Sequence, residues 1–330
     1  MSRLPNQKLK LIYLSQIMKE RTDRTHGLTL AEISAALGEY GISAERKSLY
    51  DDIEALKLCG YDIRVVRDSH VRYYLDSHTF DPAELRLLVD AVQSAKFLTA
   101  KKSSDLIRKI EGLGSRYEAA QLHKQVYSTQ GLKTENEEIY SNISALQTAI
   151  AENRQLRCLY FEWNANKQRL LRKNGDEYRL SPWALMWDDE FYYLVAYDSD
   201  AKKIKHFRVD KMLKVCLVDE KREGSEAFAD FDPALYSQRS FGMYGGEQIN
   251  VRILADNALA GVVMDRFGVN VTILNRGDCF EFCTKVMVSP TFFAWVLGFG
   301  GKMKILSPEN VAEQAAAIAE EALAQYRLKI

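Results

Sequence analysis

The chain of 330 residues lacks net charge, because its 45 Lys and Arg residues balance 45 Asp and Glu residues. Any binding site for a polyanion must therefore come from a local group of basic residues. The sequence also lacks a long apolar run and a hydrophobic signal core near Met1, so we expect neither a membrane-spanning helix nor secretion. With 47% hydrophobic residues, this composition is typical of a globular cytoplasmic protein.

Cysteine and the usual catalytic spacings are scarce as well. The five cysteines are Cys59, Cys158, Cys216, Cys279 and Cys283. Cys279 and Cys283 lie four apart in a strand-like run, which is not a zinc-ligand spacing, so we expect buried, reduced thiols. The histidines form no HxxxH pair, and the glycine-rich run 298–301 follows a helix and precedes a strand, the reverse of a phosphate-binding loop. We therefore predict no catalytic residues, no metal and no cofactor.

Three helices are predicted in the first 60 residues. The first is marked by apolar residues at helical spacing, namely Leu9, Ile12, Tyr13 and Ile17. Thr29 can cap a second helix over residues 30–40, and a third begins at Ser43. The buried stripe of the third helix is Leu49, Ile53 and Leu56. Side chains on its other side are expected to face solvent.

Two short strands with several arginines follow, over residues 63–66 and 71–75. Three helices and a basic hairpin are typical of a winged helix-turn-helix, in which the start of the third helix enters the major groove. A small helical bundle with a solvated third helix is the alternative. We expect double-stranded operator DNA to contact Arg46, Lys47, Ser48, Tyr50, Arg67 and Arg72. Residues 1–75 contain twelve Lys and Arg against ten Asp and Glu, so binding is expected to need a homodimer.

A helical connector is predicted after this head, and a separate small domain ends the chain. Asp81, Pro82 and Glu84 form a helix start with an acceptor, a proline and a glutamate in the favoured positions. The connector is either an inert scaffold or a lever that pairs two chains, and we favour the lever because the head is weakly charged. Residues 223–330 show the order β-α-β-β-α-β-α, which is ferredoxin-like.

Two adjoining strands between these regions have an unusual composition. A period of two places Ile204, His206 and Arg208 on one face of the second strand. Tyr192 and Tyr193 lie on opposite faces of the first strand. Aromatic rings beside a histidine and an arginine suit a stacked, anionic ligand, to which both would supply positive charge. Alternatively, the aromatics only fill a small barrel and Arg208 pairs with Asp210 or a neighbour.

Three submotifs of this stretch, at matching spacing, resemble the WYL family of bacterial regulators. They are Ser181-Pro182-Trp183-Ala184-Leu185, Tyr192-Tyr193-Leu194-Val195 and His206-Phe207-Arg208-Val209-Asp210-Lys211. Tyr192 stands where the family name has tryptophan. In the head, residues 51–56 resemble the family's Arg-Asp-(Ile/Leu)-x-x-Leu segment, with an aspartate in place of the arginine. Residues 295–300 resemble part of the C-terminal extension, WCX, of many such regulators.

The resemblance implies an α+β multidomain fold and a ligand-responsive transcriptional regulator. Its expected parts are a winged helix-turn-helix head (1–78), a helical connector (79–134), a small Sm/SH3-like β-barrel WYL domain (135–222) and a ferredoxin-like WCX domain (223–330). WYL domains are regarded as ligand sensors, in some members of single-stranded DNA, so we expect a single-stranded oligonucleotide or nucleotide effector. Its expected contacts are Tyr160, Ser181, Trp183, Tyr192, Tyr193, His206, Arg208 and Lys211. The alternative function is a constitutive DNA-binding or protein-interaction module without a small ligand.

Overall fold

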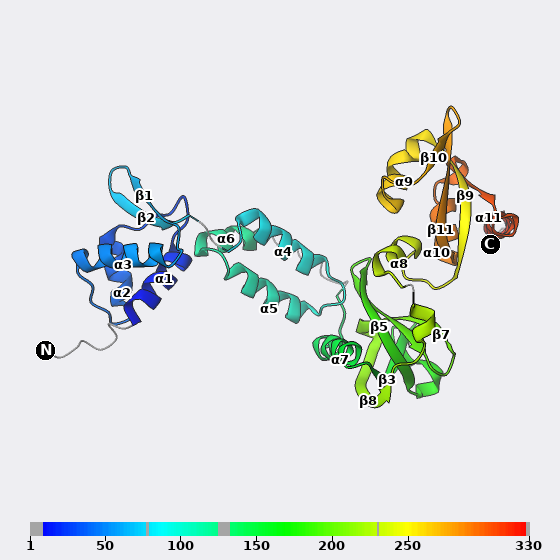
Figure 1. Ribbon diagram of the computed structural model, residues 1–330, viewed down its shortest axis with the longest axis horizontal. Coiled ribbons are helices and arrows are strands. Elements are labelled where there is room, and N and C mark those ends of the chain that lie inside the picture. The colour runs from blue at the N-terminus through cyan, green and yellow to red at the C-terminus, as the bar shows by residue number, and fades with distance from the viewer. Residues whose placement is uncertain (1–8, 77–78, 125–132, 230, 328–330) are drawn as a thin grey trace. The chain divides into compact units, whose positions relative to one another are not determined.

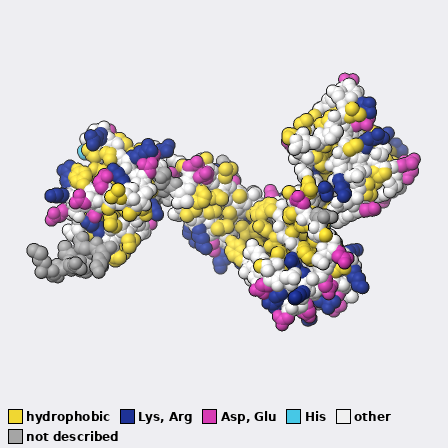
Figure 2. All heavy atoms as spheres, viewed as in Figure 1, with side chains coloured by type: hydrophobic (Ala, Val, Ile, Leu, Met, Phe, Trp, Pro, Cys, Tyr) yellow, Lys and Arg dark blue, Asp and Glu magenta, His cyan; other side chains and the backbone are white. Residues whose placement is uncertain are grey.

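The computed structural model describes residues 9–76, 79–124, 133–229 and 231–327. The chain forms two compact units, Met1–Glu135 and Asn136–Ile330 (Figure 1). The predicted boundary at residue 78 lies outside the described residues, and the boundary at residue 222 stays a prediction. Basic and acidic side chains are interspersed over the face that Figure 2 shows. No helix in the described part of the chain is both long and apolar enough to cross a bilayer.

Three helices and an antiparallel hairpin form the first part of unit 1. They are α1 (Lys10–Arg21), α2 (Leu30–Gly38), α3 (Arg46–Leu58), β1 (Ile63–Arg67) and β2 (Val71–Leu75). The predicted cap of α2 is confirmed, because Thr29 Oγ1 accepts a hydrogen bond from Glu32 N while Glu32 Oε2 accepts one from Thr29 N. The backbones of Leu28 and Tyr73 exchange two hydrogen bonds, so the loop before α2 adds a short bridge to the hairpin.

The buried stripe predicted for α3 is confirmed, but two other details of the head differ from the prediction. α3 begins at Arg46 and not at Ser43, because Ile42 is buried in the core and the next three residues are not helical. Leu9, which precedes α1, and Ile12 of α1 are both exposed, the latter by 61%. The residues that α1 contributes to the core are Leu14, Ile17 and Met18.

The connector consists of α4 (Pro82–Ser94), α5 (Ala100–Glu111) and α6 (Arg116–Lys124). The predicted start of α4 is confirmed, since Asp81 Oδ1 accepts a hydrogen bond from Glu84 N at 2.8 Å and Glu84 Oε2 accepts one from Asp81 N at 2.9 Å. A small apolar core holds the three helices together; its buried members are Leu85, Val89, Ile107, Ile110 and Leu122.

A buried polar contact ties the connector to the head. Ser115 Oγ donates a hydrogen bond to Asp23 Oδ2 at 2.9 Å, and the rings of His26 and Tyr117 stack with centroids 3.6 Å apart. Burial by itself would raise the pKa of the Asp23 carboxyl, but hydrogen bonds from Thr25, His26 and Ser115 outweigh burial and lower it. Asp23 is therefore charged at neutral pH, where these hydrogen bonds are strongest.

In unit 2, α7 (Ile139–Ala151) packs against a bent sheet of six strands. They are β3 (Arg154–Trp163), β4 (Arg169–Leu171), β5 (Tyr178–Asp188), β6 (Phe191–Asp198), β7 (Lys203–Arg208) and β8 (Met212–Lys221). The strand order is β4-β3-β5-β6-β7, and β8 also pairs with β3. Leu146 of α7 and Leu156, Leu194 and Phe207 of the sheet are almost completely buried. Whether this sheet belongs to the Sm/SH3-like barrels stays a prediction.

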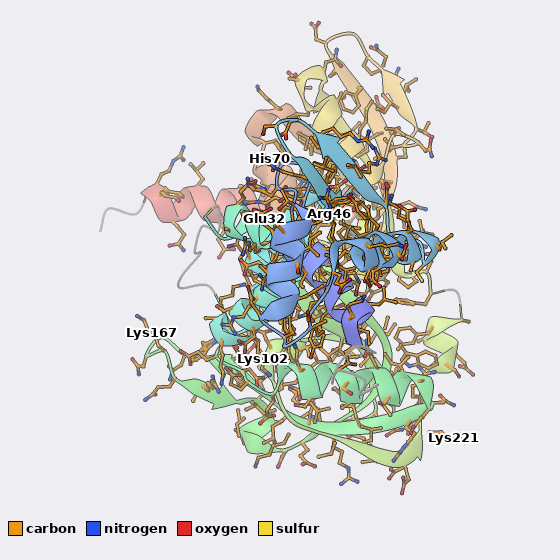
Figure 3. The ribbon with its side chains drawn as sticks, turned by 90° about the vertical axis from the view of Figure 1, so that its left-hand side faces the viewer. Glu32, Arg46, His70, Lys102, Lys167 and Lys221 are labelled. Atoms are coloured by element: carbon orange, nitrogen blue, oxygen red, sulfur yellow. The ribbon has the colours of Figure 1, made fainter. Side chains whose placement is uncertain are left out.

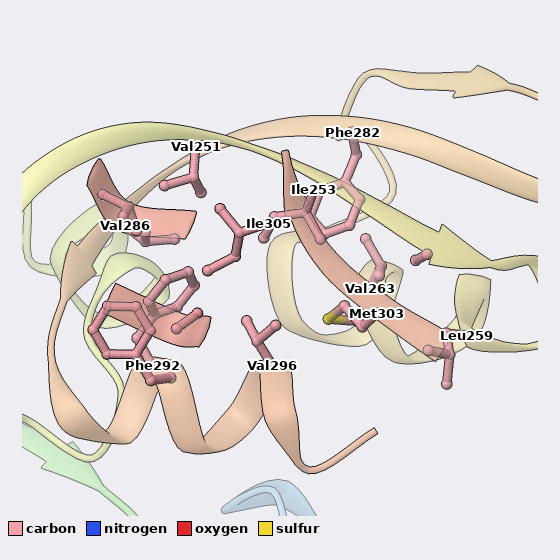
Figure 4. Packing of buried hydrophobic residues seen from close by; sticks show 14 of the residues in the cluster. Val251, Ile253, Leu259, Val263, Phe282, Val286, Phe292, Val296, Met303 and Ile305 are labelled. Carbon is pink, nitrogen blue, oxygen red and sulfur yellow. The ribbon is translucent and has the colours of Figure 1, made fainter. Parts of the chain in front are cut away.

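The last part of unit 2 is a four-stranded antiparallel sheet with helices. Its elements are β9 (Glu247–Asp256), α9 (Ala260–Phe267), β10 (Ile273–Asn275), β11 (Cys279–Val288), α10 (Pro290–Leu297), β12 (Met303–Ser307) and α11 (Glu309–Arg327). This is the predicted element order, and the strand order β10-β11-β9-β12 is that of a split βαβ arrangement. Figure 4 shows the apolar side chains that join the sheet to its helices, among them Ile253, Phe282 and Val296.

The expectation of buried cysteines is wrong for β11. Phe280 and Phe282 are buried in the apolar core. Successive side chains of a strand point to opposite faces, so Cys279 and Cys283 lie on the other face, where Cys283 is exposed and Cys279 is half-buried. All five cysteines lie outside any disulfide bond in the described structure.

Replacing Ser115 by alanine tests the contact between head and connector. Ser115→Ala should lower the free energy of unfolding by about 1.5–3 kcal/mol at neutral pH through the lost hydrogen bond to the Asp23 carboxylate. It should cost about 1 kcal/mol more because Ser115 Oγ also accepts a hydrogen bond from Glu118 N at the start of α6. Urea denaturation followed by circular dichroism measures this value. Since the pKa of Asp23 is lowered in the folded protein, the difference should shrink as the pH falls through that pKa. Ser94→Ala removes an exposed hydroxyl bonded within α4 and should change little; equal losses in both variants would contradict the assignment.

Candidate nucleic-acid and effector sites

The outward face of α3 carries three of the predicted DNA-binding residues. Arg46, Lys47 and Tyr50 are exposed, and Arg46 Nη2 donates a hydrogen bond to Tyr50 OH at 3.4 Å. This hydrogen bond lowers the pKa of Tyr50. Ser48 lies on another side of the helix, because it accepts a hydrogen bond from Lys10 Nζ of α1 at 2.5 Å. The structure therefore groups Arg46, Lys47 and Tyr50 and separates Ser48 from them.

A cleft of about 410 Å³ lies between α3 and the hairpin. Arg46 and Tyr50 line it from α3, and His70 and Tyr73 line it from the hairpin. Figure 3 shows Glu32, Arg46 and His70 together at this end of the head. The other two predicted residues belong to the hairpin strands: Arg67 ends β1, and Arg72 of β2 has Nη1 3.8 Å from Asp68 Oδ2. The head thus presents a concave, partly basic surface.

The predicted faces of β6 and β7 are confirmed by their pairing. The register places Tyr193 beside Arg208 and Val195 beside His206 on one face of the sheet. Tyr192 lies on the opposite face, where its ring meets that of Trp187 edge-on at 5.4 Å. Three predicted effector residues therefore lie together, and a fourth, Tyr192, lies apart from them.

Arg208 is held by partners within the chain. Its Nε and Nη2 donate hydrogen bonds to the two carboxylate oxygens of Asp210 at 3.1 and 2.8 Å. Its guanidinium also lies 3.4 Å from the centroid of the Phe191 ring. The pairing with Asp210 is the alternative that the sequence left open. A ligand anion at Arg208 would have to share this cation with Asp210.

Residues 224–229 and 231–246, here named the covering segment, contribute side chains that pack on the same face of the sheet. The segment includes α8 (Pro233–Arg239), which lies close to β5 in Figure 1. Phe228 and Tyr236 of the segment form one apolar cluster with Val195 of β6. Trp183, predicted to stack on an effector, stacks instead on Phe228 with centroids 4.8 Å apart and donates from Nε1 to the carbonyl oxygen of Glu223.

The covering segment changes the expected chemistry of His206. Its Nε2 lies 2.8 Å from the Tyr236 hydroxyl, and burial lowers the pKa of His206 from 6.5 to about 4. The expectation that His206 supplies positive charge is therefore wrong at neutral pH, because desolvation disfavours the charged imidazolium.

Tyr160 and Ser181 have structural partners as well. The Tyr160 hydroxyl, on a ring that is 7% exposed, accepts a hydrogen bond from the backbone N–H of Arg208 at 3.2 Å. Ser181 is completely buried, and its Oγ accepts a hydrogen bond from Glu223 N at 2.8 Å. Both side chains hold strand ends in place. Their role toward an effector stays a prediction.

Lys211 is the predicted residue whose surroundings point most directly to an anion. It is half-buried, and burial, followed by the nearby charge of Arg208, lowers the pKa of its ammonium group, although the carboxylates of Asp210 and Glu162 oppose this shift. Within the described residues it forms no ion pair shorter than 4.0 Å. Arg172, which the sequence analysis missed, also repels it and forms an ion pair with Glu162 at 2.8 Å. The basic run Lys167–Lys173 was the signal that could have revealed Arg172.

The described residues contain no group of three or more His, Cys, Asp or Glu side chains that could hold a metal ion. Arg208, Lys211 and Arg172 offer positive charge at one edge of the covered face, and Phe191 and Tyr193 lie beside Arg208. This arrangement can bind an anionic group next to a planar one.

Residues 141–217 match the family model of the WYL domain, and residues 247–323 match that of the WCX domain. The chain therefore carries the two domains that its motifs predicted. Among solved structures it is similar to proteasome accessory factor B/C (PafBC) of Arthrobacter aurescens, with 20% identity and a TM-score of 0.30 over 96% of this chain and 49% of that chain. It is also similar to a CRISPR Cas-related protein, with 14% identity and a TM-score of 0.37 over 67% of this chain and 61% of that one. The chain spans about half the length of the PafBC chain. No curated protein sequence matches it.

The burial of His206 predicts how stability depends on pH. Its pKa is lower in the folded protein than in the unfolded chain, so the unfolded chain binds the proton more tightly. The contribution of His206 to the free energy of unfolding should be complete well above pH 6.5. It should be lost as the pH falls toward 4, by at most about 3.5 kcal/mol. Urea titrations across this range should show a smaller pH dependence for His206→Asn than for wild type. The exposed His70 provides the control: an equal reduction in His70→Asn would contradict the assignment.

Proposed function

We propose that this chain is a homodimeric, DNA-binding transcriptional regulator that responds to a ligand and has no catalytic role. The observation that carries the proposal is the exposed basic start of α3, with Arg46 and Lys47, beside a cleft that the hairpin closes. In a winged helix-turn-helix, this part of the third helix enters the major groove, and the hairpin contacts the backbone or the minor groove. Arg67 and Arg72 are the hairpin residues placed for that contact.

Dimerisation follows from the weak charge of the head. A few phosphate contacts give an affinity that falls steeply with salt, whereas two linked heads on one duplex bind with a high effective concentration. Two heads of one dimer would read half-sites separated by about one helical turn or a multiple of it, and the operator would be roughly palindromic. The connector is our candidate for the element that pairs the chains.

We assign effector binding to the edge of the WYL domain where Lys211 lies. Burial and the charges of Arg208 and Arg172 disfavour the charged form of Lys211, while the carboxylates of Asp210 and Glu162 act in the opposite sense. A phosphate bound at Lys211 would favour its charged form further. Phe191 and Tyr193 provide rings next to Arg208 on which a base could stack. The proposed ligand is a nucleotide or a short single-stranded oligonucleotide.

A second candidate function is a constitutive DNA-binding or interaction module without a small ligand. It is favoured by the internal partners of three predicted ligand residues: Arg208 pairs with Asp210, His206 meets Tyr236, and Trp183 stacks on Phe228. In that case the covering segment is a permanent part of the WYL domain, and only the head has a ligand.

The operator contacts can be tested by removing the basic start of α3. The double variant Arg46→Ala, Lys47→Ala should weaken binding to a duplex selected from genomic fragments by the full chain. The slope of log K against log salt should decrease by about 0.9 for every phosphate that the variant no longer neutralises, and removing hydrogen bonds to one base pair should cost roughly 1–3 kcal/mol at that position. Lys57→Ala, in the last turn of α3, removes a charge that pairs with Glu54 and should change little. An unchanged affinity and slope in the double variant would exclude α3 as the recognition helix.

Lys211 provides the sharper test of effector binding. Lys211→Met should weaken the binding of a labelled single strand of DNA by about 10- to 100-fold, which corresponds to one hydrogen bond with a charged group. Its free energy of unfolding should stay equal or rise, because a half-buried, repelled cation is removed. Arg208→Ala is less suitable, since it leaves Asp210 without its ion pair.

Lys203→Met is the matched control for Lys211→Met, because it removes an exposed cation from β7. Equal affinity of wild type, Lys203→Met and Lys211→Met would exclude Lys211 from the site. A folded wild type that binds operator but neither oligonucleotides nor nucleotides would support the constitutive module.

A further inference from the structure

The β3–β4 hairpin is a basic surface that none of the WYL motifs includes. β3 and β4 pair from Phe161 opposite Leu171 to Trp163 opposite Arg169. Between Trp163 and Gly175 the chain has four cations and no acidic residue; the cations are Lys167, Arg169, Arg172 and Lys173. This is a dense run of positive charge in a chain whose net charge is zero.

Backbone and side-chain hydrogen bonds fix the conformation of the turn in this hairpin. Asn164 N donates to the carbonyl oxygen of Gln168 at 3.0 Å, and Gln168 N donates back to Asn164 Oδ1 at 2.9 Å. Lys167 has a φ of 60°, in the left-handed region, and its N–H donates to the carbonyl oxygen of Asn164. The position of the Lys167 backbone is thus fixed by the turn, and Figure 3 shows this lysine at the outer edge of the unit.

Trp163 presents a half-exposed aromatic face beside this charge. Its side chain is 48% exposed, although a ring of this size is usually buried. The Arg169 guanidinium lies 5.5 Å from the Trp163 ring centroid and 4.9 Å from that of Phe161. Phe161 meets Trp163 edge-on at 5.6 Å and fixes one side of the ring. An aromatic plane flanked by cations is the arrangement that binds single-stranded nucleic acid without reading its sequence.

The hairpin is continuous with the proposed effector site. Arg172 directly follows β4, and its guanidinium lies 5.9 Å from the centroid of the Tyr160 ring. The Tyr160 hydroxyl in turn accepts the hydrogen bond from Arg208 N, and the charge of Arg172 acts on Lys211 as well. Arg169 and Arg172 lie three residues apart, which corresponds to about 10 Å along an extended strand. A single nucleotide bound at Lys211 is too short to contact Trp163 at the same time. An oligonucleotide is long enough to contact both residues.

We infer that the β3–β4 hairpin continues the effector site, so that the effector is a single strand of several nucleotides and not a mononucleotide. Trp163 stacks one base, and Lys167 and Arg169 lie along the phosphates that follow those bound near Lys211 and Arg172. This inference rests on the proposed effector function of the WYL domain. It adds a stacking residue and two cations that lie outside the WYL motifs.

A phospholipid surface is the competing partner for a basic hairpin with an exposed tryptophan. The tip of the hairpin, residues 164–168, contains no large apolar side chain that could enter a bilayer. The exposed Leu170 and Leu171 lie behind this tip, on β4. The polar tip therefore favours an aqueous polyanion with bases over a membrane.

The test is a fluorescence anisotropy titration of the full chain with a labelled thymidine oligonucleotide of about 12 nucleotides, within the range that small barrels accommodate. Unlabelled dinucleotide serves as a short competitor. We expect wild type to bind the long strand much more tightly than it binds the dinucleotide. Trp163→Ala should weaken the binding of the long strand by about 5- to 150-fold and should leave the binding of the dinucleotide almost unchanged. Trp163→Phe should restore part of the affinity for the long strand. Lys167→Ala should reduce the salt slope by about 0.7.

Lys221→Ala is the matched control, because Lys221 is an exposed cation that lies far from Lys167 at the opposite side of the unit in Figure 3. Thermal unfolding of each variant separates loss of binding from loss of folding. If wild type binds the dinucleotide as tightly as the long strand, or if Trp163→Ala and Lys167→Ala match Lys221→Ala, the inference is wrong while the effector function stands. If wild type binds neither oligonucleotides nor nucleotides, the effector function itself is wrong. Binding to anionic vesicles that Trp163→Ala abolishes, without binding of oligonucleotide, would overturn the inference in favour of a membrane partner.

Discussion

The cost of removing charge from water governs the WYL domain. Arg208 and His206 lie on one face of β7, and the covering segment removes His206 from water. Arg208 keeps its charge because Asp210 accepts two hydrogen bonds from it, whereas His206 has the neutral Tyr236 hydroxyl as its hydrogen-bond partner among the described residues and is itself neutral. The positive charge that can attract a ligand is therefore found at the edge of the face, at Lys211 and Arg172, and its centre is apolar.

Short sequence patterns predicted many helix and strand boundaries, because these boundaries depend on residues that are close together in the sequence. Thr29 and Asp81 mark helix starts through hydrogen bonds that span three residues, and any chain with this spacing can form them. The alternation of β6 and β7 likewise fixes which side chains share a face. The buried side of α1 could not be read in this way. Apolar residues occur all around α1, and only packing against α2 and α3 decides that Leu14 is buried and Ile12 exposed.

The candidate effector site shows what short sequence patterns cannot predict. The period of two placed His206 and Arg208 on one face of β7 and Tyr192 and Tyr193 on opposite faces of β6, but only the register shows that Tyr193 lies beside Arg208. It could not show that Phe228 and Tyr236 cover this face, because the pattern within a strand contains no information about which distant segment packs on it. The same limit explains why Arg172 was missed: it is separated in sequence from Lys211 by three strands, and only the fold brings the two charges together.

A chain without net charge can still bind polyanions, because screening makes electrostatics local. At physiological ionic strength the Debye length is about 8 Å, so a phosphate near Lys211 interacts with adjacent cations and hardly with acids elsewhere on the molecule. Few contacts at each site also mean modest affinity. In the proposed regulator, tight operator binding then depends on holding two heads at the correct spacing, since the second head binds at a high effective concentration. A ligand that changes this spacing would alter operator affinity strongly while every contact within each head stays the same.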